Sequence, residues 1–188
     1  MLTRNKMLFL SIILAIIFGL VIWQFFIENY RINDVEIPVS QNITFNNQMP
    51  QNIDSKILEK EFENNLNKPI LLYLYTTWCQ VCNKNFATIN EIAREFQNTD
   101  LQVFALAIDR NADNNLIQDY FKKLPEVYFL PKILENRNGF LELLQSKQVR
   151  YNNRIPYTIL FARDGSVLAK YSGTKSKNYL RNKIIKEL

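Results

Sequence analysis

The strongest constraint on the fold of this chain is the run Ile70–Tyr75, six apolar or aromatic residues without interruption. A run of this length with no polar alternation is typical of a strand that is covered on both faces. A second apolar run follows at Leu101–Ile108. Between the two runs, four apolar residues recur at helical spacing: Phe86, Ile89, Ala93 and Phe96. This order predicts two parallel strands joined by a helix through a right-handed crossover.

Further elements are indicated on both sides of this unit. Before it, Asp54 or Ser55 can cap a helix that ends at Lys68–Pro69. The apolar residues of that helix are Ile57, Leu58, Phe62 and Leu66. After the unit, the pattern favours a helix with Leu116, Tyr120, Phe121 and Leu124, a short strand at Val127–Leu130, and a helix at Phe140–Ser146.

The C-terminal part predicts a hairpin and a closing helix. Pro156 precedes a strand at Tyr157–Phe161, which turns at Asp164-Gly165 and pairs back over Val167–Tyr171. Ser176 can cap the closing helix, whose apolar residues are Tyr179, Leu180, Ile184 and Leu188. The alternation of strands and helices predicts an α/β fold around a mostly buried mixed sheet with an antiparallel end.

Residues 7–27 are 21 consecutive uncharged residues between Lys6 and Glu28. As a helix, the segment is about 30 Å long and matches the hydrocarbon core of a bilayer. A cleaved signal peptide would be shorter and would end in small residues, whereas this segment ends in bulky ones. An uncleaved transmembrane anchor is therefore favoured over a signal peptide and over a buried core helix.

The charges around this segment predict its orientation. Arg4 and Lys6 precede it, and three acidic residues against one arginine follow within residues 28–36. Because the basic flank stays in the cytoplasm, we expect residues 1–6 there and the rest of the chain outside, in the periplasm if the membrane is bacterial. The polar, Asn-rich residues 28–52 suggest a linker with one short edge strand at residues 43–45, and residues 53–188 are expected to form the folded domain.

Composition excludes several classes of function. The chain has no histidine, which excludes histidine-ligated metal sites and Ser-His or Cys-His catalytic pairs. Its four glycines form no glycine-rich phosphate loop. Beyond residue 27, 21 basic residues are interspersed with 18 acidic ones, so no basic stripe indicates nucleic-acid binding.

Cys79 and Cys82 are the only cysteines, and they lie where a buried strand is followed by a helix. The N–H groups of the first helical turn and the positive end of the helix dipole stabilise a thiolate on the first cysteine. The spacing brings the second sulfur close enough to form a disulfide. Cys79 is the expected exposed nucleophile and Cys82 the less exposed resolving cysteine.

Two other interpretations of the cysteines stay open from the residues alone. The pair can be structural, because cysteine is often simply buried. It can also bind a thiophilic ion such as Cu(I), but with no histidine and no further cysteine only a weak or transient site fits. The redox interpretation is favoured, and it needs no cofactor and no metal.

The residues Trp78-Cys79-Gln80-Val81-Cys82 after an apolar strand, with Ile155-Pro156-Tyr157-Thr158 before a later strand, resemble the thioredoxin superfamily. The resemblance implies a thioredoxin fold over residues 53–188, in which Pro156 is a cis-proline beside the redox disulfide and Trp78 and Ile155 support the site. The N-terminal anchor and an insertion at about residues 110–150 are similar to the membrane-tethered, TlpA-like branch.

Several positions depart from the pattern of that superfamily. Tyr73 stands where thioredoxin has a buried aspartate, and Asn85 stands where tethered cytochrome c maturation proteins often have a glutamate. No proline follows or interrupts the cysteine motif. The superfamily's proton-handling groups therefore have no counterpart in this chain, and the sequence does not indicate what activates Cys82.

The sequence thus predicts a membrane-anchored thiol-disulfide oxidoreductase that acts on protein disulfides outside the cytoplasm. By analogy with the tethered branch, its role is expected to be reductive, in cytochrome c maturation for example, with a membrane protein as electron donor or acceptor. The alternative is a tethered binding module, which docks a partner or Cu(I) while its cysteine pair stays structural.

Overall fold

The computed structural model describes residues 16–24, 50–109, 119–120, 122–123 and 126–188. The chain divides into two compact units, residues 1–36 and 37–188. In the first unit, residues 16–24 are helical, and the rest of the predicted anchor at 7–27 lies outside the described residues. Among the helices that are described, none is both long enough and apolar enough to span a membrane.

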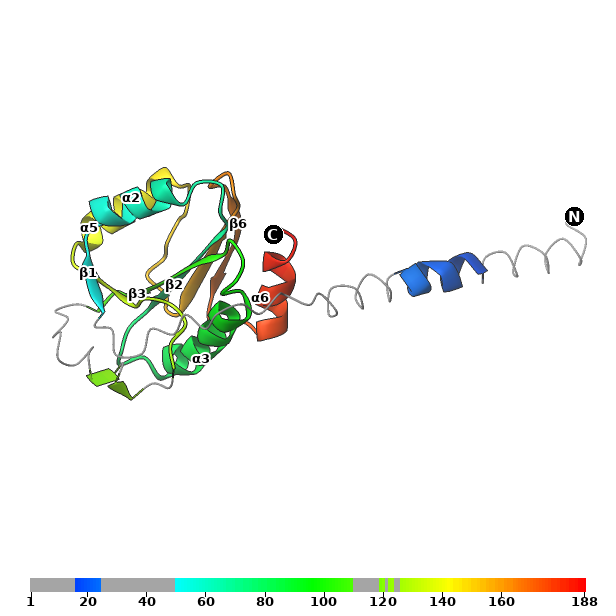
Figure 1. The fold of residues 1–188 in the computed structure, drawn as a ribbon, viewed down its shortest axis with the longest axis horizontal. Helices are drawn as coiled ribbons and strands as arrows, with labels where there is room; N and C mark the ends of the chain where they lie inside the picture. The colour runs from blue at the N-terminus through cyan, green and yellow to red at the C-terminus, as the bar shows by residue number, and fades with distance from the viewer. Residues whose placement is uncertain (1–15, 25–49, 110–118, 121, 124–125) are drawn as a thin grey trace, which may run out of the picture. The chain divides into compact units, whose positions relative to one another are not determined.

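A six-stranded mixed sheet forms the centre of the second unit (Figure 1). Its strands lie in the order β1-β4-β3-β2-β5-β6. Their bounds are β1 Gln51–Ile53, β2 Ile70–Tyr75, β3 Gln102–Ala107, β4 Lys132–Leu134, β5 Tyr157–Phe161 and β6 Val167–Ser172. The first four strands of this order pair in parallel. Strand β5 pairs antiparallel with both of its neighbours, β2 and β6. The predicted parallel pair and antiparallel end are thus confirmed.

Helices cover the two faces of the sheet (Figure 1). Helices α2 (Ser55–Asn64) and α5 (Arg137–Ser146) pack together on one face, and α3 (Gln80–Glu95) and α6 (Lys177–Ile184) on the other. Every residue of β2 is buried. Its side chains alternate between the two faces, with Leu71, Tyr73 and Tyr75 on the α3 side. This arrangement explains why the sequence of β2 has no polar position.

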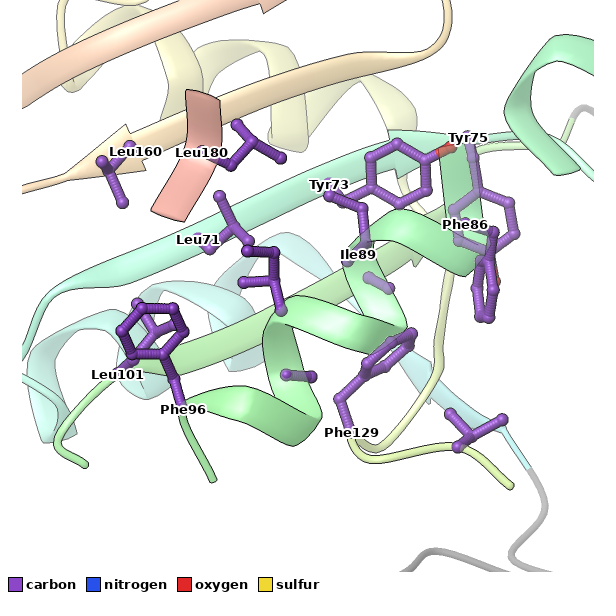
Figure 2. Packing of buried hydrophobic residues seen from close by; sticks show 14 of the residues in the cluster. Leu71, Tyr73, Tyr75, Phe86, Ile89, Phe96, Leu101, Phe129, Leu160 and Leu180 are labelled. Carbon is purple, nitrogen blue, oxygen red and sulfur yellow. The ribbon is translucent and has the colours of Figure 1, made fainter. Parts of the chain in front are cut away.

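The larger core cluster fills the space between the sheet and α3 (Figure 2). Phe96 and Leu101 lie at the far end of α3, and Tyr73, Tyr75 and Phe86 lie together near its N-terminal end. All five side chains are buried. The first turns of α3 therefore rest on a layer of aromatic rings that comes mostly from β2.

The prediction for the first helix was partly wrong. Helix α2 is capped by Asp54, whose carboxylate accepts the N–H of Ile57 at 2.8 Å. Only Leu58 and Phe62 of its apolar residues are buried, whereas Ile57 and Leu66 are exposed. Leu66 lies beyond the last helical residue, Asn64, and Leu58 and Phe62 alone form the face that lies on the sheet.

The strand expected at Val127–Leu130 is also wrong, because the pairing strand is β4, at Lys132–Leu134. The Asn90 side chain explains the difference. It donates to the Glu126 carbonyl at 2.7 Å and accepts the Tyr128 N–H at 2.9 Å. Backbone groups that a sheet would use are thus bonded to an amide of α3. The helix expected from Leu116 to Leu124 lies mostly outside the described residues, although Asp119 and Tyr120 are helical.

Candidate active site

Cys79 is the N-cap of α3, one short loop after the end of β2. Its sulfur accepts the backbone N–H of Cys82 at 3.1 Å, and its carbonyl accepts the N–H of Asn83 at 3.0 Å. The sulfur therefore lies at the positive end of the helix, where a thiolate is stabilised. Cys79 and Cys82 are joined by a disulfide, with their Cα atoms 5.1 Å apart.

The two cysteines differ in exposure. Cys82 is fully buried, with 0% of its surface exposed, and Cys79 is half-buried. Their neighbours Trp78 and Val81 are 72% and 52% exposed, which is unusual for large apolar side chains. An incoming disulfide therefore meets Cys79 in an apolar surrounding, and Cys82 lies behind it.

Asp109 fixes the loop that leads to Cys79. It follows β3, and its Oδ1 accepts the Thr77 hydroxyl at 2.8 Å and the Thr77 N–H at 3.1 Å. Its Oδ2 lies 3.2 Å from the same N–H. These bonds join the ends of two parallel strands two residues before the nucleophile. Asp109 is therefore a positioning residue for the cysteine loop.

A layer of tyrosines lies below the motif. The rings of Tyr73 and Tyr75 are stacked with centroids 5.4 Å apart, and Phe86 meets Tyr75 edge-on at 5.4 Å. Tyr120 packs against Phe86 at 5.9 Å. Burial raises the pKa of Tyr120 to about 12, with a further contribution from the Asp109 carboxylate. Burial also raises the pKa of Tyr75 well above its ordinary value, so both hydroxyls are neutral at physiological pH.

Tyr73 contacts the buried cysteine directly. Its hydroxyl donates to the carbonyl of Cys82 at 2.9 Å. Burial raises the pKa of Tyr73 well above the ordinary value, and a side-chain hydrogen bond with Asn85 offsets part of this shift. Tyr73 and Asn85, the two positions that depart from the superfamily pattern, thus meet beside Cys82.

The Ile155–Pro156 peptide bond is cis, the conformation that the resemblance implies. Tyr157 pairs with Leu74, so Pro156 lies at the end of the sheet from which the cysteine loop leaves β2. Its carbonyl accepts the N–H of Gly173 at 2.9 Å. Ile155 is half-buried and packs against the core clusters of both faces. The cysteine motif and the cis-proline Pro156 are therefore at the same end of the sheet.

No group of three or more His, Cys, Asp or Glu side chains within the described part of the chain is arranged to hold a metal ion. The site as described consists of two sulfurs, aromatic rings, amides and hydroxyls, and one carboxylate that bonds to the backbone. This set of groups suits thiol–disulfide exchange, which uses only the two sulfurs and protons.

Comparison with known proteins places the chain in a family. The profile of the AhpC/TSA family matches residues 41–185, which include the whole sheet and the cysteine motif. The chain belongs to the AhpC/TSA family. This family is part of the thioredoxin superfamily, so the resemblance is confirmed, and its relatives are of the TlpA-like branch.

The relatives of this family member are thiol-disulfide oxidoreductases by name. The chain is 24% identical over 180 residues to the thiol-disulfide oxidoreductase ResA of Bacillus thuringiensis subsp. konkukian (strain 97-27), covering 94% of each chain. Among solved structures, a Chlorobium tepidum protein described as a DsbE-type thiol:disulfide interchange protein matches with a TM-score of 0.56 and 19% identity, over 67% of this chain and 84% of that one. DsbF of Mycobacterium tuberculosis matches with a TM-score of 0.52 and 18% identity, over 67% and 85%. These likenesses confirm the thioredoxin-like fold.

Two residues of the site in this AhpC/TSA member were not found from the sequence. Asp109 contacts Thr77 across 32 residues, a contact that depends on β2 and β3 ending side by side. The available signal was an aspartate directly after a buried strand, at the carboxyl edge of a parallel sheet. Tyr73 was noted only as a departure, and an unbroken apolar run gives no sign that one of its hydroxyls bonds to a cysteine.

Proposed function

We propose that this chain is a thiol-disulfide oxidoreductase that exchanges electrons with protein disulfides through Cys79 and Cys82. The observation that carries the proposal is the position of the pair: the half-buried sulfur caps α3 and the fully buried one lies behind it. The names of the relatives support the same activity. Exposed Trp78 and Val81 supply an apolar contact for the substrate chain.

In the reductive direction, the Cys79 thiolate attacks one sulfur of a substrate disulfide. A bond forms between Cys79 and that sulfur, and the other substrate sulfur leaves as a thiolate and takes up a proton. The sulfur of Cys82, after losing its proton, then attacks Cys79. The mixed disulfide breaks, the second substrate sulfur leaves as a thiolate that takes up a proton, and the Cys79–Cys82 disulfide forms. The substrate thus gains two electrons from the enzyme and two protons, one of which Cys82 has released and one of which comes from solvent.

The enzyme is anchored by residues 7–27, with residues 1–6 in the cytoplasm and its folded domain outside. The support is the length and apolarity of this segment and the basic residues Arg4 and Lys6 before it. Its physiological role is the reduction of protein disulfides in that compartment, as in cytochrome c maturation, with electrons from a membrane reductase. This role rests on analogy with the tethered branch of the superfamily.

The test uses the full chain in detergent and two variants. Cys79→Ala should abolish formation of a mixed disulfide with a protein substrate, and Cys82→Ala should trap it as a species resolved on a non-reducing gel. Full activity of both variants would overturn the proposal. A structural pair or a Cu(I) module would instead show no reversible exchange with glutathione.

The reduction potential of the pair tests the direction of electron flow. Thiol trapping in graded glutathione buffers should give a value near that of thioredoxin, about −270 mV, for a reductant that draws on a membrane donor. A value near about −120 mV, as in strong oxidants, would contradict the reductive role.

A further inference from the structure

Cys82 belongs to a small polar network inside the aromatic cluster. The Tyr73 hydroxyl donates to the Cys82 carbonyl at 2.9 Å, and the Asn85 side chain lies close enough to this hydroxyl to lower its pKa. Asn85 follows Cys82 by three residues on α3, so the two side chains lie on one face of the helix, a turn apart. Tyr73 is 0% and Asn85 2% exposed.

One atom of this network has no partner. The amide oxygen of Asn85 is buried and accepts no hydrogen bond while the disulfide is formed. A buried acceptor without a donor is unfavourable, so a donor that forms beside it in another state of the molecule would be stabilised there. Reduction of the disulfide supplies a donor on the same helix face, because Cys82 then carries an S–H group.

The groups around Cys82 are mostly neutral. Its own helix contributes Cys79, Asn85 and Phe86, strand β2 contributes the hydroxyls of Tyr73 and Tyr75, and Tyr120 packs behind Phe86. Burial keeps the three tyrosines protonated, and an amide does not ionise. The Asp109 carboxylate, at this end of the sheet, bonds to Thr77 through its oxygens.

We propose that Asn85, held by Tyr73, is a positioning residue that keeps Cys82 as a thiol in the reduced enzyme. The proposal deepens the oxidoreductase function and rests on it. The Asn85 oxygen accepts the S–H of Cys82 and so favours the neutral thiol over the thiolate. No group of this network takes the proton in the resolving step. Cys82 releases it to solvent, its sulfur attacks Cys79, and the electron pair of the broken mixed disulfide leaves with the substrate thiolate, which solvent protonates.

This arrangement sets the pH dependence of resolution. Because only the Cys82 thiolate attacks, the resolving rate should rise about tenfold per pH unit below the pKa of Cys82 and level off above it. At neutral pH the mixed disulfide is then long-lived. The residue that sets the lifetime of the mixed disulfide is Asn85, whose side-chain amide is uncharged.

The experiment uses the reduced full chain in detergent and the aromatic disulfide DTNB, which releases a coloured thiolate at each step. The first release reports attack by Cys79, and the second reports resolution by Cys82. Both are followed by stopped flow from about pH 5 to about pH 10. In Asn85→Ala, the acceptor for the S–H of Cys82 is lost, so the pKa of Cys82 should fall by about one unit. The second release at neutral pH should become about tenfold faster, and the break in its pH profile should move down by the same unit.

Two further variants make the result interpretable. Asn83→Ala changes an exposed asparagine on the same helix and should leave the profile unchanged. Tyr73→Phe keeps the ring stack and removes the hydroxyl that bonds to the Cys82 carbonyl and interacts with Asn85, so it should shift the break in the same direction by a smaller amount. Tyr73→Phe also provides the test if Asn85→Ala fails to fold.

The outcomes separate the two proposals. If the wild type shows no second release, Cys82 does not resolve mixed disulfides and the proposed function itself fails. If the wild type resolves normally but the break stays in place in both Asn85→Ala and Tyr73→Phe, Asn85 does not hold Cys82 as a thiol and its positioning role is refuted. If the role of Asn85 were purely structural, Asn85→Ala would lower the stability of the fold and leave the break in the pH profile where it is in the wild type.

Discussion

The hydrogen bonds between Asp109 and Thr77 allow a quantitative test of how the cysteine loop is held. Replacement of Asp109 by alanine removes the acceptor of two Thr77 donors, the N–H and the hydroxyl, which lie 3.1 and 2.8 Å from Oδ1. A hydrogen bond to a charged group contributes about 1.5–3 kcal/mol. Because the site is half-buried, the lower value applies to each donor, and Asp109→Ala should cost about 3 kcal/mol of unfolding free energy.

Asp109→Asn should cost much less. Both short bonds are made to one oxygen, so an asparagine whose amide oxygen takes the place of Oδ1 keeps them and loses only the charge. The expected cost is about 1 kcal/mol. Removal of the carboxylate should also lower the pKa of Tyr120 below about 12, because Asp109 contributes to that shift.

Urea unfolding followed by near-ultraviolet circular dichroism measures these free energies, and absorbance titration measures the tyrosine pKa. The DTNB assay adds a functional readout, since a loosened loop should slow the first release. Asp119→Ala is the control, because its pair with Lys122 lies on the surface and contributes less than about 1 kcal/mol. Equal destabilisation by Asp109→Ala and Asp109→Asn, or a cost of Asp109→Ala no larger than that of the control, would refute the reasoning.

Two further predictions concern the core and the tyrosine layer. Lys132 is buried and pairs with Glu61 at 2.6 Å, so Glu61→Gln should lower the unfolding free energy by about 2 kcal/mol. Lys132→Met should lower it less, because the charge that it leaves unpaired is that of Glu61, whose side chain is partly exposed. Urea unfolding of the two variants checks this, and a larger loss in Lys132→Met than in Glu61→Gln would contradict it. Because the pKa of Tyr120 is about 12 in the folded chain, the unfolded chain ionises first, and stability should fall as the pH rises from about 10 to about 12. Tyr120→Phe should reduce this fall, and an identical fall in the variant would show that Tyr120 does not contribute to it.

The sequence predicted the central elements because burial dictates them. An unbroken run such as Ile70–Tyr75 is typical of a strand covered on both faces, and the four periodic residues of α3 and its C-cap all contact the core. The three-residue strands β1 and β4 were missed because so few residues carry no periodicity. Strand β1 begins at Gln51, two residues before the expected start of the domain. The expected edge strand at residues 43–45 lies outside the described residues.

The residues of the candidate site also fall into those that the sequence predicted and those that it did not. Cys79 and Cys82 were found because their spacing and position carry a chemical mechanism within five residues of sequence. Asp109, the Tyr73 hydroxyl and the Asn90 bonds were missed because each depends on the final arrangement of distant segments. Asn90 reaches residues 36 and 38 positions away, and such contacts follow from packing and not from local pattern.

The position of Asp109 has a consequence for how this fold can diversify. It closes the cysteine loop from the last residue before the predicted insertion, and the chain rejoins the sheet where Lys132 pairs with Leu106. The geometry of the redox pair is thus fixed before residue 110 is reached. Residues added or exchanged between this point and Lys132 leave the hydrogen bonds between Asp109 and Thr77 in place, so substrate preference can change in this part of the insertion while the cysteine loop stays tied to β3.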